Sequence, residues 1–138
     1  MAANTAPIFT VAPDVQWSPI TVLASNTTTD GTTGTTYLIF SASADGGFVQ
    51  RVRFRALGNN VATVGRIWIN NGQTSGSAAN NALIDEITLN ATTATSAASL
   101  ANQEVPINFA LPAGYRLFVT LGTTVATGFD VTAIGGKY

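Results

Sequence analysis

The chain lacks cysteine and histidine, and it carries very little charge. Its 138 residues include 6 Lys and Arg and 7 Asp and Glu, so 9% of them are charged, against roughly 25% in an average soluble domain. Without cysteine there are no disulfides and no thiolate chemistry, and without histidine the usual general base at neutral pH is missing. Most of the chemistry that an enzyme uses is therefore absent. We expect a protein without catalytic activity and without a cofactor or a metal.

The charge balance also limits the partners. The net charge is −1, which gives no electrostatic attraction for nucleic acid or for an anionic membrane. The N-terminus reads Met-Ala-Ala-Asn, with no basic segment and no long apolar run behind it. A secretory signal would need a basic segment followed by an apolar run, and a membrane span would need a long apolar run. We expect synthesis in the cytoplasm, and neither a nucleic acid nor a membrane as partner.

Small neutral residues fill the chain instead. It holds 21 Thr, 21 Ala, 13 Gly, 11 Asn and 8 Ser, which is more than half of its length. Threonine favours strands, whereas Gly, Asn and Ser favour turns, so the composition predicts an all-β protein. A monomer usually covers its surface with Lys and Glu, and this chain has one Lys. We infer that other copies or a larger assembly cover much of its surface.

Eight segments have strand patterns and are separated by turn signals such as Asp45-Gly46-Gly47 and Gly58-Asn59-Asn60. Such regular short strands are typical of a sandwich or a barrel. The sequence predicts an antiparallel β-sandwich, with a jelly roll favoured over an immunoglobulin-like fold. The strands are expected at about 20–24, 36–42, 48–57, 61–70, 83–90, 103–110, 115–121 and 128–134. Pro106 interrupts one of them, which places that strand at an edge or a bulge.

Residues 1–19 differ from the rest, because they hold three of the five prolines. Proline removes a donor from a β-ladder and is excluded from central strands. We therefore expect an extended N-terminal arm over 1–19 and a single β-sandwich domain over 20–138. The arm is too apolar to be free in water, so we expect it to dock on a neighbouring subunit or a larger assembly; the alternative is that it covers its own sandwich. Its apolar residues are Ile8, Phe9, Val11, Val15 and Trp17.

Arginines alternate with apolar residues in the segment 48–57. Strict alternation places Arg51, Arg53 and Arg55 on one face, together with Val49, and Phe54 with its neighbours on the other. The resulting cationic stripe either faces an acidic surface of a partner or pairs with acidic residues of adjacent strands.

Large apolar groups also fall on the second face of other strands. Trp68 shares its face with Arg66, and Phe118 shares its face with Arg116. One explanation is a second core beneath the arm or the long loops. The other is a subunit interface, since aromatic residues and Arg are enriched in interfaces while Lys and Glu are depleted. With one Lys in the chain, we favour an interface, and we expect Trp68 and Phe118 to point outward.

The one adjacent acidic pair, Asp85 and Glu86, does not suggest catalysis. Neighbouring residues on a strand point to opposite faces, so the two carboxylates cannot act on one substrate atom. Asp85 falls on the apolar side, which indicates a bulge or a pairing with arginine.

The chain resembles the small virion proteins of tailed bacteriophages. The resemblance rests on the N-terminal Met-Ala-Ala-Asn-Thr-Ala-Pro-Ile-Phe, on Gly-Asn-Asn-Val-Ala-Thr-Val-Gly-Arg-Ile-Trp-Ile-Asn at 58–70, on Leu-Pro-Ala-Gly-Tyr-Arg-Leu-Phe-Val-Thr-Leu-Gly at 111–122, and on the ending Val-Thr-Ala-Ile-Gly-Gly-Lys-Tyr. It is greatest to capsid decoration, or cement, proteins built on a jelly roll. It implies a homo-oligomer, most often a trimer, that binds the major capsid protein on the outside of the head and is made in the host cytoplasm.

Two other functions remain open from the sequence. The first is a receptor- or glycan-binding domain of a tail fibre or baseplate, in which Trp17, Trp68 and Tyr37 would stack on sugars. The sequence shows no cluster of carboxylates and amides for that role. The second is a shell-forming jelly-roll coat protein, for which 138 residues is short.

Overall fold

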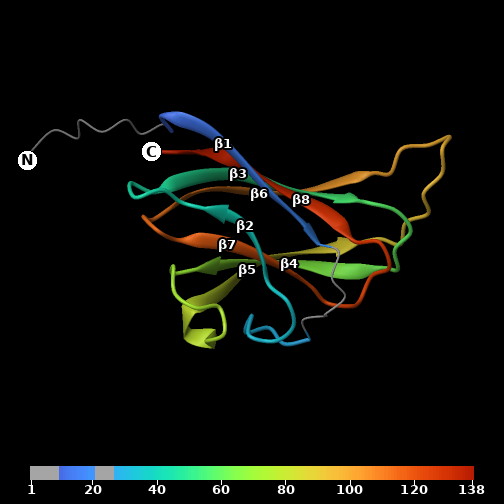
Figure 1. Cartoon of the computed structure of the whole chain (residues 1–138), viewed down its shortest axis with the longest axis horizontal. Helices are drawn as coiled ribbons and strands as arrows, with labels where there is room; N and C mark the ends of the chain where they lie inside the picture. The colour runs from blue at the N-terminus through green and yellow to red at the C-terminus, as the bar shows by residue number, and fades with distance from the viewer. Residues whose placement is uncertain (1–9, 21–26) are drawn as a thin grey trace, which may run out of the picture.

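The computed structural model describes residues 10–20 and 27–138. In this part the chain forms two four-stranded antiparallel sheets that pack face to face (Figure 1). Sheet A has the strand order β1-β8-β3-β6, and sheet B has the order β2-β7-β4-β5. The elements are β1 (Ala12–Ile20), β2 (Tyr37–Ser41), β3 (Gly47–Ala56), β4 (Thr63–Asn70), a 3-10 turn η1 (Ala78–Asn80), β5 (Asn81–Leu89), β6 (Asn102–Leu111), β7 (Arg116–Leu121) and β8 (Phe129–Lys137).

The expected all-β sandwich is confirmed, and seven of the expected strands lie within a few residues of the observed ones. The turn signals determine these boundaries, because Gly and Asn break the ladder where the alternation ends. The expected strand at 20–24 reaches into residues 21–26, which lie outside the described residues. The 3-10 turn at Ala78–Asn80 was not expected.

The hydrophobic core lies between the inner faces of the two sheets. Phe54 from sheet A packs against Gly65 of sheet B, where a Cβ atom would come within 2.9 Å of the phenyl ring. The small residue at this position therefore lets a large ring fit between the layers. The largest fully buried core side chains are Ile20, Ile39, Phe40, Val49, Val52, Phe54, Ile67, Leu89, Leu111, Leu117 and Val119.

The predicted alternation in β3 is wrong at Val49. The register between β3 and both of its neighbours shifts between Val49 and Arg51. Relative to β8 the extra residue is Gln50, whereas relative to β6 the extra residue lies on β6, between Pro106 and Phe109. A bulge of this kind turns the residues before it to the opposite face. Val49 is fully buried in the core, and Arg51, Arg53 and Arg55 are on the outer face as expected.

The expected arm over 1–19 is corrected for its second half. Residues 12–19 belong to β1, which pairs with β8 along its whole length, so the boundary between arm and domain does not fall at 19/20. Pro13 and Pro19 are tolerated because β1 is an edge strand, with one neighbour in its sheet. Residues 1–9, with Ile8 and Phe9, lie outside the described residues.

Pro106 has both of the expected features. It lies in β6, which is the other edge strand of sheet A, and the register between β3 and β6 shifts beside it. The two edges of sheet A thus each carry proline, and the sheet's outer face lies between them.

Candidate functional site

The outer faces of the two sheets differ in what covers them. The connections at 27–36 and 71–80 gather over the outer face of sheet B, below the sandwich in Figure 1. Within the described residues, no connection crosses the outer face of sheet A, which is turned upward in the same view. Those expected interface residues that lie in 10–20 and 27–138 are divided between these two faces and do not form one surface.

Trp68 points to the outer face of sheet B, but it is not open to a partner. Its side chain is 2% exposed, and its indole Nε1–H donates to Thr120 Oγ1 at 2.9 Å. Gly31 lies so close above the ring that a Cβ atom there would be 3.2 Å from Trp68 Cε3. The expectation of an outward, uncovered Trp68 is wrong, because the chain's own 27–36 loop covers it. For Trp68, the explanation that holds is a second core beneath a long loop, and not a subunit interface.

The other candidates on sheet B are partly covered as well. Arg66 Nε lies 2.6 Å from Glu86 Oε1, and its side chain is largely buried. Arg116 and Phe118 are half-buried on the adjacent β7. Asp85 sits at a register shift between β4 and β5, as the sequence suggested, with its own Oδ1 accepting from the Glu86 backbone N–H at 2.7 Å.

Asp30 holds the loop that covers Trp68. Its Oδ1 accepts from Thr28 Oγ1 at 2.6 Å, from Thr32 Oγ1 at 2.8 Å and from the Thr32 backbone N–H at 3.0 Å. These bonds favour the carboxylate and lower the pKa of Asp30 to about 2, the bond from Thr28 contributing most. The charged form of Asp30 therefore stabilises the closed loop.

We expect this loop to loosen in acid. Because the pKa of Asp30 is lowered on folding, its contribution is fully present above the ordinary value of 3.8 and is lost as the pH falls through about 2. In a Trp17→Phe variant, Trp68 is the one remaining tryptophan, and its emission should shift to the red over this window. An Asp30→Asn variant should not show the titration. A Trp68 emission that is constant from pH 5 to the acid limit of the folded state would contradict the prediction.

The register of sheet A places three rows of side chains across its outer face. The Arg51 row contains Val15, Ile134, Arg51 and Pro106. The Arg53 row contains Trp17, Thr132, Arg53 and Glu104. The Arg55 row contains Pro19, Asp130, Arg55 and Asn102. Each row runs from β1 through β8 and β3 to β6, so residues distant in sequence form one surface.

Two of the three arginines share one carboxylate. Glu104 Oε1 accepts from Arg53 Nε at 2.7 Å, and Glu104 Oε2 lies 3.6 Å from Arg51 Nε. Arg55 donates to Asn102 Oδ1 at 3.1 Å, and it has no carboxylate partner in residues 10–20 and 27–138. Asp130, in the same row, forms no ion pair with any described residue. The face thus keeps an arginine and an aspartate that are not paired with each other.

The β1 edge of this face is apolar and exposed. The exposed fractions are 70% for Val11, 48% for Val15 and 67% for Trp17. These side chains alternate with Asp14 and Gln16, which point inward, and Gln16 bonds to the Ser41 backbone N–H and C=O of sheet B. β1 is therefore fixed to the sandwich while its apolar residues point to solvent. These three side chains do not cover the sandwich, although β1 itself lies on the chain's own domain as one of its strands.

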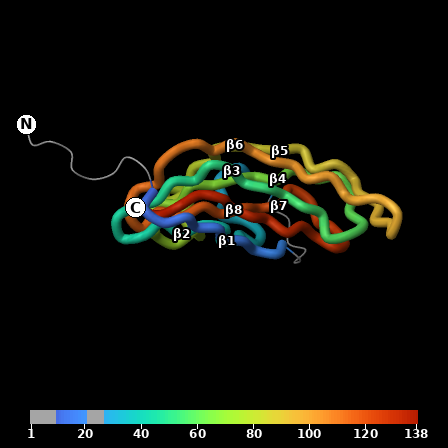
Figure 2. The backbone as a smooth tube through the Cα atoms, turned by 90° about the horizontal axis from the view of Figure 1, so that it is seen from above, coloured from blue at the N-terminus to red at the C-terminus, as the bar shows by residue number. Residues whose placement is uncertain are grey.

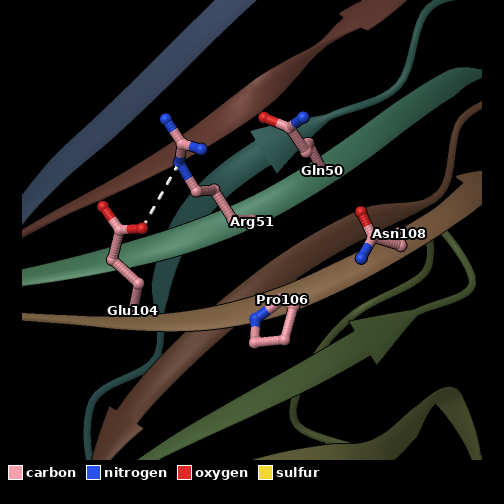
Figure 3. A pocket seen from close by; sticks show the side chains of 5 residues that line it. All are labelled: Gln50, Arg51, Glu104, Pro106 and Asn108. Atoms are coloured by element: carbon pink, nitrogen blue, oxygen red, sulfur yellow. Dashed lines mark ion pairs between the residues drawn. The ribbon is translucent and has the colours of Figure 1, made fainter.

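A pocket of about 290 Å³ lies near the opposite edge of the same face. It is lined by Gln50, Arg51, Glu104, Pro106 and Asn108 from β3 and β6, and Figure 3 shows Arg51 and Glu104 directed at each other beside it. Asn108 has a φ of 51° and is the one non-glycine described residue with positive φ. The bulges at Gln50 and Pro106 open the hollow, because they interrupt the even spacing of the two strands.

This pocket was not predicted from the sequence. It brings together one carboxylate and two amides, a combination that the sequence pattern does not show. Pro106 was the one signal that pointed here. The pairing of β3 with β6, which joins residues 47 to 64 positions apart, cannot be found from local pattern.

Other kinds of site are not present in the described residues. Among them there is no group of three or more acidic side chains that could hold a metal ion, and no helix long and apolar enough to cross a membrane. Comparisons of the chain with protein-family models, with curated proteins and with solved structures find no match.

Proposed function

We propose that the chain is a non-enzymatic structural protein of a tailed bacteriophage virion. In this proposal it is a decoration, or cement, protein that binds the major capsid protein on the outside of the head and stabilises it. It is made in the host cytoplasm and acts as a homo-oligomer. The observation that carries the proposal is the outer face of sheet A, which no described connection covers and which bears exposed aromatic and aliphatic groups beside three arginines.

The strand order supports a jelly roll. The sheets have the orders 1-8-3-6 and 2-7-4-5, and successive strands alternate between them except for β4 and β5, which pair within sheet B. This is the arrangement expected from two Greek keys folded over each other. Double-sheet jelly rolls are frequent in viral capsid proteins. Fold alone does not define function, so this is support for the class and not for the particular role.

The surface chemistry supports protein binding. Exposed Trp and Arg side chains are the residues that most often dominate the energy of protein interfaces. A chain with 9% charged residues also gains little solubility from its own surface. Coverage of sheet A by protein would account for both features.

Addition of the purified protein to phage heads that lack it tests the proposal. We expect the protein to co-sediment with the heads, at a fixed ratio to the major capsid protein, and to raise the temperature at which the heads release DNA. Absence of binding, or recovery of the protein with tails instead of heads, would contradict it.

One observation favours a second candidate, a glycan-binding tail component. The pocket combines Glu104 with the amides of Gln50 and Asn108, and Trp17 on the same face is exposed. Saturable binding of an oligosaccharide from the host envelope, lost in Gln50→Ala, would favour this function over decoration.

A further inference from the structure

We propose that the outer face of sheet A binds the same face of a second copy of the chain. In this pair Trp17 of each copy enters the pocket between Gln50 and Pro106 of the other. The proposal rests on the proposed function, of which it names one partner, and it specifies a two-fold pair where the family resemblance implies a trimer.

The strand order makes the face suitable for such a pairing. Consider a two-fold axis that is parallel to the strands and passes between β8 and β3 at the interface. Rotation about it places β1 of one copy over β6 of the other, and β8 over β3. Figure 2, seen from above, shows β1 and β6 at opposite edges with β8 and β3 between them. Each row of side chains then faces the same row of the second copy in reverse order.

The apolar groups meet suitable partners in this arrangement. In the Arg53 row, Trp17 faces Glu104, which is at the edge of the pocket. In the Arg51 row, Val15 faces Pro106, and Ile134 faces the aliphatic part of Arg51. The exposed side chains of β1 thus lie over the pocket and the proline of β6.

The charges are complementary as well. In the Arg55 row, Asp130 of one copy faces Arg55 of the other. Neither has an ionic partner within its own described chain. The two-fold axis makes this pair twice, so two unpaired carboxylates and two unpaired guanidinium groups come together. A translation of one copy that brought arginines over arginines would be repulsive.

The pocket is large enough for the indole. A cavity of about 150 Å³ holds benzene, and this open pocket has about 290 Å³. Arg51 beside it can stack on an aromatic face. Packed sheets cross at about 30°. The edge strands β1 and β6 lie roughly 7 Å from the axis, so this crossing angle displaces a residue of β1 by about 4 Å, or one residue, along the facing β6. The pocket extends from Glu104 to Asn108, so it accommodates that shift.

The size of the face predicts a weak dimer. Four strands about 4.8 Å apart and about 30 Å long cover roughly 550 Å² on each copy. The total of about 1,100 Å² is at the lower end of specific interfaces. We therefore expect dissociation in the micromolar range.

Sedimentation equilibrium of the purified full chain tests the pairing. The wild type should approach twice 14.2 kDa as its concentration rises through the micromolar range. Trp17→Ala removes the inserted group and Gln50→Trp fills the pocket from a strand position that accepts aromatics; each should raise the dissociation constant at least tenfold. Leu38→Ala, which removes an exposed side chain from sheet B, is the matched control and should leave it unchanged.

Mixing the two variants gives the sharpest result. A pair formed by Trp17→Ala and Gln50→Trp keeps one intact contact between Trp17 and an open pocket, so the mixture should associate more tightly than either variant alone. Circular dichroism confirms that each variant is folded. A wild type that stays monomeric, a trimer mass, a Trp17→Ala variant that dimerises normally, or a mixture that gains nothing would each overturn the proposal. A monomer that still binds heads would overturn this pairing and leave the proposed decoration of the head intact.

Discussion

The Gly135→Ala substitution is expected to destabilise the protein more than a glycine-to-alanine substitution at any other position of sheet A. A Cβ atom at Gly135 would collide with the backbone carbonyl oxygen of Phe48 and lie 3.0 Å from Val49 Cα. These are backbone atoms beside the β3 bulge, and they cannot move aside as a flexible side chain would. β3 and β8 are the two central strands of sheet A, so relief of the collision separates its main pairing.

We expect a loss of about 3 kcal/mol or more in the free energy of unfolding, at the upper end of overpacking effects. This corresponds to a fall in melting temperature of roughly 10 °C or more for a domain of this size. Gly76→Ala is the matched control, because the nearest atom to its Cβ is Thr74 Oγ1 at 3.8 Å and its φ is not positive. Thermal unfolding followed by circular dichroism measures both. Equal melting temperatures would show that β3 and β8 are not paired as described.

The second large loss of stability is expected when Asn60 is replaced by alanine. This buried side chain joins three segments at one end of the sandwich. Its Oδ1 accepts from the backbone N–H groups of Thr127 and Gly128 at 2.9 and 2.8 Å, and its Nδ2 donates to Gly128 C=O at 2.9 Å. Asn60→Ala leaves the N–H groups of Thr127 and Gly128 without these partners, whereas the Gly128 C=O keeps its bond from the Leu57 backbone N–H at 3.1 Å. Each buried unsatisfied group costs about 1–3 kcal/mol.

We expect Asn60→Ala to lower the free energy of unfolding by about 3 kcal/mol in urea titration, with little change in the slope. The control is Asn90→Ala, since Asn90 is exposed and makes no side-chain hydrogen bond to the described residues. If Asn60→Ala and Asn90→Ala unfold at the same urea concentration, the network at Asn60 contributes nothing to stability and the prediction is wrong.

The local sequence predicts the strands but not their partners. Alternation and turn signals depend on residues within a few positions of each other, and these placed β2 to β8 within a few residues. The bulge at Gln50 has no local signal, so strict alternation placed Val49 on the wrong face. Proline correctly excluded β1 from a central position, but it did not show that residues 12–19 pair with β8, more than 100 positions away.

For the candidate site too, some features follow from the local sequence and others depend on strand pairing. The common face of Arg51, Arg53 and Arg55 follows from the period of a strand, and the apolar character of Val15 and Trp17 is visible in the sequence. Their assembly into rows depends on the strand order of sheet A, which no local pattern gives. The covering of Trp68 by Gly31 joins residues 37 positions apart through a loop with no apolar pattern. The pocket likewise requires the pairing of β3 with β6.

A cryo-EM map of phage heads prepared with and without this protein tests the proposed decoration role. We expect density for a two-sheet sandwich on the outside of the capsid when the protein is present, with protein in contact with the outer face of sheet A around Trp17 and Arg55. A head prepared with the protein that lacks this density, or one in which the sandwich is present and that face is open to solvent, would contradict it.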